Sequence, residues 1–160
     1  MRFVTGWLEP KSGRLIAIDQ GVIEQAAGYC QKSLSATEAG GLLMGLRRGQ
    51  NIEIKWLTIP RETDKRQRFG FVREIIGHAA AAVAKWRETG SLADYVGEWH
   101  THPEENPTPS GIDLSEWSRQ SMERTDGRPL FFLIVGTAGF YGALCQGGVV
   151  FPMIPIEFAT

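Results

Sequence analysis

The segment 98–113 constrains the fold more than any other part of this 160-residue chain, because it combines a strand, a sharp turn and a helix start. It opens in a short strand, in which successive side chains point to opposite faces. His100 and His102 are therefore expected on one face, about 6 to 7 Å apart along the strand. Trp99 and Thr101 are expected on the other face, where they can pack into a core.

The second half of this segment predicts a turn followed by a helix. Prolines after His102 reverse the chain, and Ser110 takes the N-cap position with Asp113 three residues later, a spacing typical of a capping arrangement. Such a turn can bring the Asp113 carboxylate back over the end of the strand. Two neutral imidazoles, one carboxylate and an open fourth position are the components of a catalytic zinc site.

Glu38 stands just before an uncharged, glycine-rich segment, residues 40–45. The apolar run in this segment favours a buried strand, and the glycines at its start favour close approaches between backbones. Taken alone, Glu38 is most simply explained as a solvated loop carboxylate. Its meaning depends on what the rest of the chain resembles.

The spacing His-x-His-x7-Ser-x-x-Asp resembles the signature of the JAB/JAMM (MPN+) metallopeptidases, which cleave ubiquitin-like proteins from their conjugates. The Glu-x-Gly-Gly sequence that starts at Glu38 is similar to the upstream motif of that family. The resemblance covers nearly the whole chain. It implies an α/β fold, in which residues 1–160 form a single MPN/JAB (cytidine-deaminase-like) domain with a mixed, curved β-sheet flanked by helices.

The resemblance also implies a role for each residue of the motif. His100, His102 and Asp113 would hold one Zn2+ per chain, which keeps a position for water and lowers the pKa of that water from about 16 towards roughly 7. Glu38 would take the proton of the water and deliver it to the leaving amine, while Ser110 helps to stabilise the oxyanion. No position departs from the family pattern, which argues against an inactive scaffold domain.

Within this family, the chain looks closest to the stand-alone bacterial deconjugating peptidases of CBASS anti-phage operons. That resemblance implies hydrolysis of the (iso)peptide bond just after the C-terminal residue of a conjugated cGAS-like nucleotidyltransferase, and an operon-encoded activating/conjugating-like enzyme as a partner. Loops near the groove help to hold the substrate in related peptidases. Substrate contacts are therefore expected from four residues of the polar loop 61–71, namely Arg66, Arg68, Phe69 and Phe71.

Other functions stay open beside this one. A JAB peptidase that trims a sulfur-carrier or ubiquitin-like precursor would carry the same motif, and a non-catalytic MPN interaction module or a DNA-repair-associated JAB protein would share the fold. The formal net charge of −1 gives no general reason to expect nucleic-acid binding. The His-Glu-x-x-His motif of other zinc proteases and the Pro-Cys-x-x-Cys element of nucleobase deaminases are both missing.

The cysteines and the apolar runs restrict the compartment. Cys30 and Cys145 occupy apolar positions without a paired Cys-x-x-Cys, which favours small buried side chains over a disulfide or reactive thiols. No apolar run is long enough for a signal peptide or a membrane span, so we expect a cytoplasmic protein.

The remaining elements follow from apolar periodicity. The patterns predict helices over 21–31, 74–87 and 110–123, and strands over 14–19, 42–44, 52–59, 130–136, 139–145 and 149–158, with 130–136 central in the sheet. The helix over 74–87 is expected to face the core with Ile75, Ile76, Ala79, Ala80, Val83 and Trp86. His78 lies one position off that stripe and is expected to be a surface or packed histidine. Glu98 shares the face of the two histidines, where a contact to a metal ligand and a solvated carboxylate are equally good interpretations.

Overall fold

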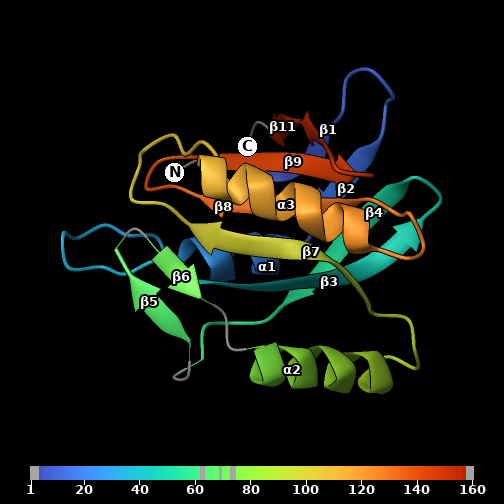
Figure 1. Cartoon of the computed structure of the whole chain (residues 1–160), viewed down its shortest axis with the longest axis horizontal. Helices are drawn as coiled ribbons and strands as arrows, with labels where there is room; N and C mark the ends of the chain where they lie inside the picture. The colour runs from blue at the N-terminus through green and yellow to red at the C-terminus, as the bar shows by residue number, and fades with distance from the viewer. Residues whose placement is uncertain (1–3, 62–63, 69, 73–74, 158–160) are drawn as a thin grey trace.

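The computed structural model describes residues 4–61, 64–68, 70–72 and 75–157, and a curved nine-stranded sheet forms the centre of this part of the chain (Figure 1). The strands in spatial order are β10 (Val149–Pro152), β9 (Phe140–Gln146), β8 (Leu130–Val135), β7 (Asp94–Thr101), β3 (Gly40–Arg48), β4 (Asn51–Leu57), β2 (Leu15–Ile18), β1 (Val4–Leu8) and β11 (Ile154–Glu157). The parallel pairs are β7 with β8 and β2 with β4, and the other neighbours are antiparallel. The expected mixed sheet is confirmed.

Helices cover the two faces of the sheet (Figure 1). They are α1 (Gln20–Ala27), α2 (Ile75–Glu88) and α3 (Gly111–Glu123), and a separate hairpin pairs β5 (Lys65–Gln67) with β6 (Gly70–Val72). On one face, α3 stacks the Trp117 ring on Phe132 of β8 at 4.9 Å between centroids. On the other face, Val22 and Ile23 of α1 join the main core around Trp99. Among the described helices, none is long and apolar enough to cross a membrane.

The sheet curls until its two edge strands approach each other. β10 and β11 follow each other with Met153 alone between them, yet they lie at opposite ends of the strand order. The N–H of Met153 donates to the carbonyl of Gly142 on β9 at 3.0 Å. The one long strand expected over 149–158 is therefore wrong. Pro152 and Pro155 lack an N–H for a continuous ladder, which is consistent with the break between them.

The other expected elements are present with shifted ends. β8 is the run expected to be central; it is the third of the nine strands in spatial order, and every one of its residues is buried. The first helix ends at Ala27, whereas its apolar pattern continues to Cys30, which packs against the core beyond the helix. The polar loop expected over 61–71 contains the β5–β6 hairpin, which the sequence pattern did not indicate.

The predicted buried face of α2 is wrong. Val83 is 46% exposed and Trp86 is 47% exposed, and Ala79 and Ala80 are exposed as well. The side chains of Ile75 and Ile76 lie outside the described part of the chain. His78, which was expected off the stripe, is 0% exposed. It is a packed histidine.

Polar contacts explain why His78 faces inward. Its Nε2 lies 2.9 and 3.1 Å from the two carboxylate oxygens of Asp64, and its Nδ1 lies 2.7 Å from the Thr58 hydroxyl. That hydroxyl accepts from the N–H of Leu42 on β3 at 2.8 Å. Because a carboxylate only accepts, Nε2 donates to Asp64, and Nδ1 shares the other hydrogen bond of the ring with the Thr58 hydroxyl. Among the described side chains of α2, this network holds His78 inward, while Ala79, Ala80, Val83 and Trp86 are exposed.

We expect His78→Ala to lower the free energy of unfolding by about 3 kcal/mol, because it removes one hydrogen-bond partner each from the buried Asp64 carboxylate and the buried Thr58 hydroxyl. Urea denaturation measures this change. Ala80→Ser, on the exposed side of the same helix, is the matched control and should change the value by less than about 0.5 kcal/mol. Equal losses in both variants would mean that the helix, and not the network, is sensitive.

Candidate metal and catalytic site

Strand β7 presents the two histidines from one face, as the alternation predicts. Trp99 is 1% exposed and Thr101 is 0% exposed, so both point into the core. His100 is half-buried, and His102 follows the end of the strand at 7% exposure. The backbone of His102 stays in line because its N–H donates to the carbonyl of Val135, the last residue of β8, at 3.0 Å.

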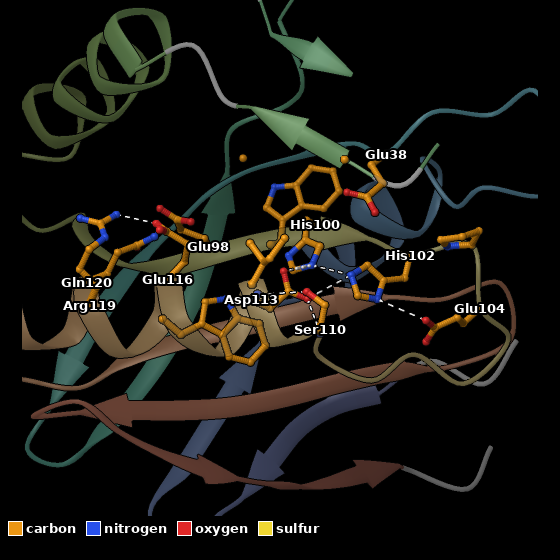
Figure 2. A pocket seen from close by; sticks show the side chains of 16 residues that line it. Glu38, Glu98, His100, His102, Glu104, Ser110, Asp113, Glu116, Arg119 and Gln120 are labelled. Carbon is orange, nitrogen blue, oxygen red and sulfur yellow. Dashed lines mark hydrogen bonds and ion pairs between the residues drawn. The ribbon is translucent and has the colours of Figure 1, made fainter. Parts of the chain in front are cut away.

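The start of α3 brings the carboxylate to the histidines. Ser110 is the N-cap, its hydroxyl oxygen accepts from the N–H of Asp113 at 3.0 Å, and its own N–H donates to Asp113 Oδ2 at 2.8 Å. The expected capping arrangement is confirmed as a reciprocal capping box. Because the cap fixes the carboxylate, Oδ1 lies 3.3 Å from His100 Nε2 and Oδ2 lies 3.2 Å from His102 Nε2 (Figure 2).

The three side chains form a set that fits a zinc ion. The Nε2 atoms of His100 and His102 are 3.0 Å apart, and one ligand atom from each residue lies within 4.8 Å of the others. Ligands held 2.0–2.1 Å from one tetrahedral ion lie roughly 3.3 Å from each other. The other ring nitrogen of His102, Nδ1, is buried without a hydrogen-bond partner among the described residues and lies 3.9 Å from Glu104 Oε1. The histidine–histidine–aspartate set is the one such group in the described residues.

The field of the site favours positive charge between the histidines. Burial raises the pKa of Asp113, but the hydrogen bonds with His100 and His102 outweigh it and hold that pKa well below its usual range. Burial lowers the pKa of His102, yet the hydrogen bond to Asp113 and the nearby carboxylates raise it overall. A cation at this position would satisfy the same field.

Glu38 faces the two histidines from the side opposite Asp113 (Figure 2). It is 7% exposed, and this burial raises the pKa of its carboxyl, although the nearby histidines lower it. Both of its peptide groups contact the β5–β6 hairpin. Its N–H donates to the carbonyl of Gln67 at 2.5 Å, and its carbonyl accepts from Arg66 Nε at 2.8 Å. The carboxylate is thus buried beside the candidate metal position without belonging to the ligand set.

A cavity of about 630 Å³ contains these groups and continues along α3. Its wall includes Gly70 of the hairpin, and its far end carries Glu98, Glu116, Arg119 and Gln120 (Figure 2). Glu98 is half-buried in this wall, and its carboxylate accepts from the Tyr95 hydroxyl at 3.2 Å. The sequence reasoning did not assign Glu116 and Trp117 to the cavity. They stand three and four residues after Asp113, on the same helix face, and that spacing was the available signal.

The four predicted substrate residues are placed unequally. Arg68 Nη1 donates to the carbonyl of Ser33 at 2.8 Å, and Arg66 binds Glu38 as described, so both arginines help to attach the hairpin. Phe71 lies in β6, but its side chain is outside the described part, and Phe69 lies outside it altogether. A substrate contact stays a prediction for all four.

Neither cysteine offers a competing site. Cys145 is 0% exposed on β9, and burial raises the pKa of its thiol to about 12. Cys30 is half-buried against the core, and both thiols are free. The expectation of a small buried side chain is confirmed for Cys145, whereas Cys30 packs against the core but is only half-buried.

The sequence of this chain is similar to a known protein family and to named bacterial proteins. A family profile described as prokaryotic homologues of the JAB domain matches residues 21–144. A Pseudomonas aeruginosa protein named CD-NTase/cGAS isopeptidase is 41% identical over 160 residues, which cover 98% of this chain and 100% of the relative. An Escherichia coli protein of the same name is 36% identical over 121 residues, 76% of each chain.

A solved structure supports the fold independently. The solution structure of a protein from Desulfitobacterium hafniense has a TM-score of 0.57 and covers 90% of this chain and 91% of its own, at 20% identity. Identity this low speaks for the fold alone. The profile match over residues 21–144 contains Glu38 and the whole segment from His100 to Asp113, and with the full-length relative it shows that the chain belongs to the prokaryotic JAB-domain family.

Proposed function

We propose that this protein is a zinc-dependent isopeptidase of bacterial anti-phage (CBASS) defence. In this proposal it cleaves the bond after the C-terminal residue of a conjugated cGAS-like nucleotidyltransferase and releases that protein from its targets in the cytoplasm. The observation that carries the chemistry is the buried Glu38 carboxylate beside the convergent His100, His102 and Asp113. The names of the relatives support the substrate class. An operon-encoded activating/conjugating-like enzyme would form the conjugate.

Zinc held by the two histidines and Asp113 would polarise the scissile carbonyl and lower the pKa of water. Glu38 accepts the proton of the attacking water and returns it to the leaving amine. Burial raises the pKa of Glu38, which makes its carboxylate a stronger base than a solvated glutamate. The Ser110 oxygen already accepts from Asp113 N–H, so its own hydrogen is free to donate to the oxyanion.

The cavity gives this chemistry a peptide channel. It extends from the metal position along α3, with the hairpin residue Gly70 and the α3 residue Trp117 in its wall. An extended C-terminal tail fits such a groove, because the tail has to bring one carbonyl to the metal position while the folded body of the substrate stays outside.

The test is incubation with a cGAS-like nucleotidyltransferase that carries a fusion at its C-terminus. Metal-dependent release after the last residue of the nucleotidyltransferase, identified by mass spectrometry, supports the proposal. Cleavage only of sulfur-carrier or ubiquitin-like precursors would assign the enzyme to a different substrate. No cleavage of either kind would favour a non-catalytic module.

We expect Glu38→Ala to bind zinc and to lose cleavage by a factor of about 10² to 10⁴, because the change removes the proton carrier and no ligand. Cleavage rate and zinc content are measured on the same preparation. Loss of zinc from this variant would overturn the assigned role.

Wild-type protein is expected to bind about one zinc per chain, as counted by elemental analysis. His102→Ala and Asp113→Ala each remove one of the three ligands and should lose stoichiometric zinc. Glu116→Ala, in the wall of the same cavity, is the matched control and should keep it. Retention of zinc in His102→Ala would place the metal elsewhere.

Chelation is expected to stop cleavage, and added zinc to restore it. Alkylation of the native protein should leave the rate unchanged, because burial and the raised pKa make the Cys145 thiol unreactive and the proposed chemistry uses no thiol. Strong inhibition by alkylation would instead point to Cys30 or Cys145.

A further inference from the structure

Gln31 is a buried amide that joins segments far apart in the chain. It follows α1 and is 2% exposed. Its Nε2 donates to the carbonyl of Arg68 at 2.7 Å and to the carbonyl of Ala36 at 3.2 Å. Its Oε1 accepts from the Thr101 hydroxyl at 3.0 Å. One side chain therefore links the hairpin, the loop before β3 and the strand of the metal ligands.

Thr101 connects Gln31 to Ala39, the residue that follows Glu38. It stands between His100 and His102 and is 0% exposed. Its hydroxyl oxygen accepts from the N–H of Ala39 at 2.9 Å, and its own N–H donates to the carbonyl of Ala39 at 2.9 Å. Side chain and backbone of Thr101 thus both hold the residue next to the proposed proton carrier.

The hairpin also binds Glu38 directly, so Gln31 and Glu38 contact the same hairpin. The carbonyl of Gln67 accepts from the Glu38 N–H at 2.5 Å, and Arg66 Nε donates to the Glu38 carbonyl at 2.8 Å. The next hairpin residue, Arg68, binds Gln31 through its carbonyl. Glu38 lies between these two attachments, so its backbone cannot shift without changing the hairpin or the β7 contact.

We propose that Gln31 is a positioning residue that fixes Glu38 relative to the two histidines and couples it to the β5–β6 hairpin. This inference rests on the proposed function, because the coupling affects a rate only if Glu38 is the proton carrier. A neutral amide suits the role, since it supplies two donors and an acceptor, whereas a carboxylate only accepts and an ammonium only donates.

The network has the donor and acceptor order that the role requires. The Thr101 hydroxyl has one hydrogen, which goes to Gln31, and its oxygen receives the Ala39 N–H. Thr101→Val keeps the shape of the side chain and removes both bonds, whereas Thr101→Ser keeps the hydroxyl. Gln31→Met keeps the length of the side chain without its polar groups. These variants separate hydrogen bonding from volume.

The experiment compares kcat and KM of these variants, with zinc content measured on each. A displacement of about 1 Å at a catalytic group costs roughly 10²-fold in rate. Gln31→Met and Thr101→Val should therefore lose kcat by about 10- to 100-fold with KM within about threefold and zinc retained. Thr101→Ser should restore kcat to within about threefold of wild type.

A matched control removes a buried hydroxyl on another part of the fold. Ser121 is 2% exposed on α3, accepts from Gly148 N–H at 3.0 Å and donates to the Ser118 carbonyl at 3.0 Å. Ser121→Ala should leave kcat unchanged. An equal loss of kcat in Ser121→Ala would show that general destabilisation, and not positioning, governs the rate, and would overturn the proposal.

Amide hydrogen exchange reads the coupling without relying on activity. In Gln31→Met, segments 36–42 and 64–68 should exchange faster than in wild type, while 130–146, the segment of the buried strands β8 and β9, stays unchanged. Unchanged exchange in both outer segments would overturn the coupling even if kcat fell. A wild-type protein that cleaves no conjugate would contradict the proposed function, and the exchange result would still decide whether Gln31 joins the hairpin to the Glu38 segment.

Discussion

The antiparallel pairing of β3 with β7 is the constraint on which the rest of the site depends. It places Gly40 opposite His100 and Gly41 opposite Trp99, so the residues just before β3 reach the end of β7 that carries the candidate ligand His100. A Cβ on Gly41 would lie 2.2 Å from the carbonyl oxygen of Thr58, which no side chain can occupy. The second glycine of the Glu-x-Gly-Gly motif is therefore a packing requirement of the sheet. By allowing this close packing of β3, Gly41 helps to set the position of Glu38, which lies just before the strand.

The site holds the carboxyl groups of Glu38 and Asp113 where burial disfavours their charged forms. Glu38 is 7% exposed, and the Asp113 carboxylate lies between two imidazoles and a helix N-terminus. The capping box satisfies Asp113, and the hairpin satisfies the peptide groups of Glu38, but neither neutralises the surplus of acidic groups. A divalent cation would do so, which connects the stability of this region to the proposed chemistry.

The short β5–β6 hairpin contacts the backbone of Glu38 on both sides of that residue. Among the described strands, β5 and β6 pair only with each other. Arg66 and Gln67 nevertheless bind both peptide groups of Glu38, and Asp64 anchors the same connection to α2 through His78. The segment after β4 is thus held at two points by buried polar groups. These attachments fix the position of the hairpin beside the candidate site.

The sequence by itself determined the local features of the site. Strand alternation placed His100 and His102 on one face, and the Ser110 to Asp113 spacing predicted the cap, because both depend on residues close together in the chain. The buried run of β8 was predictable for the same reason. The role of Glu38 needed the family resemblance, since nothing local distinguishes it from a solvated glutamate.

Only the tertiary structure decided which faces are covered and which distant groups meet. His78 is buried because Asp64 and Thr58 reach it from other segments, and apolar periodicity along α2 contains no trace of those partners. Likewise, nothing in the sequence near Gln31 indicates that its side chain is bound to Thr101, because the two residues meet only in the folded chain. Periodicity records the preference of one element for water or for a core, whereas hydrogen bonding between distant side chains depends on how the whole sheet closes.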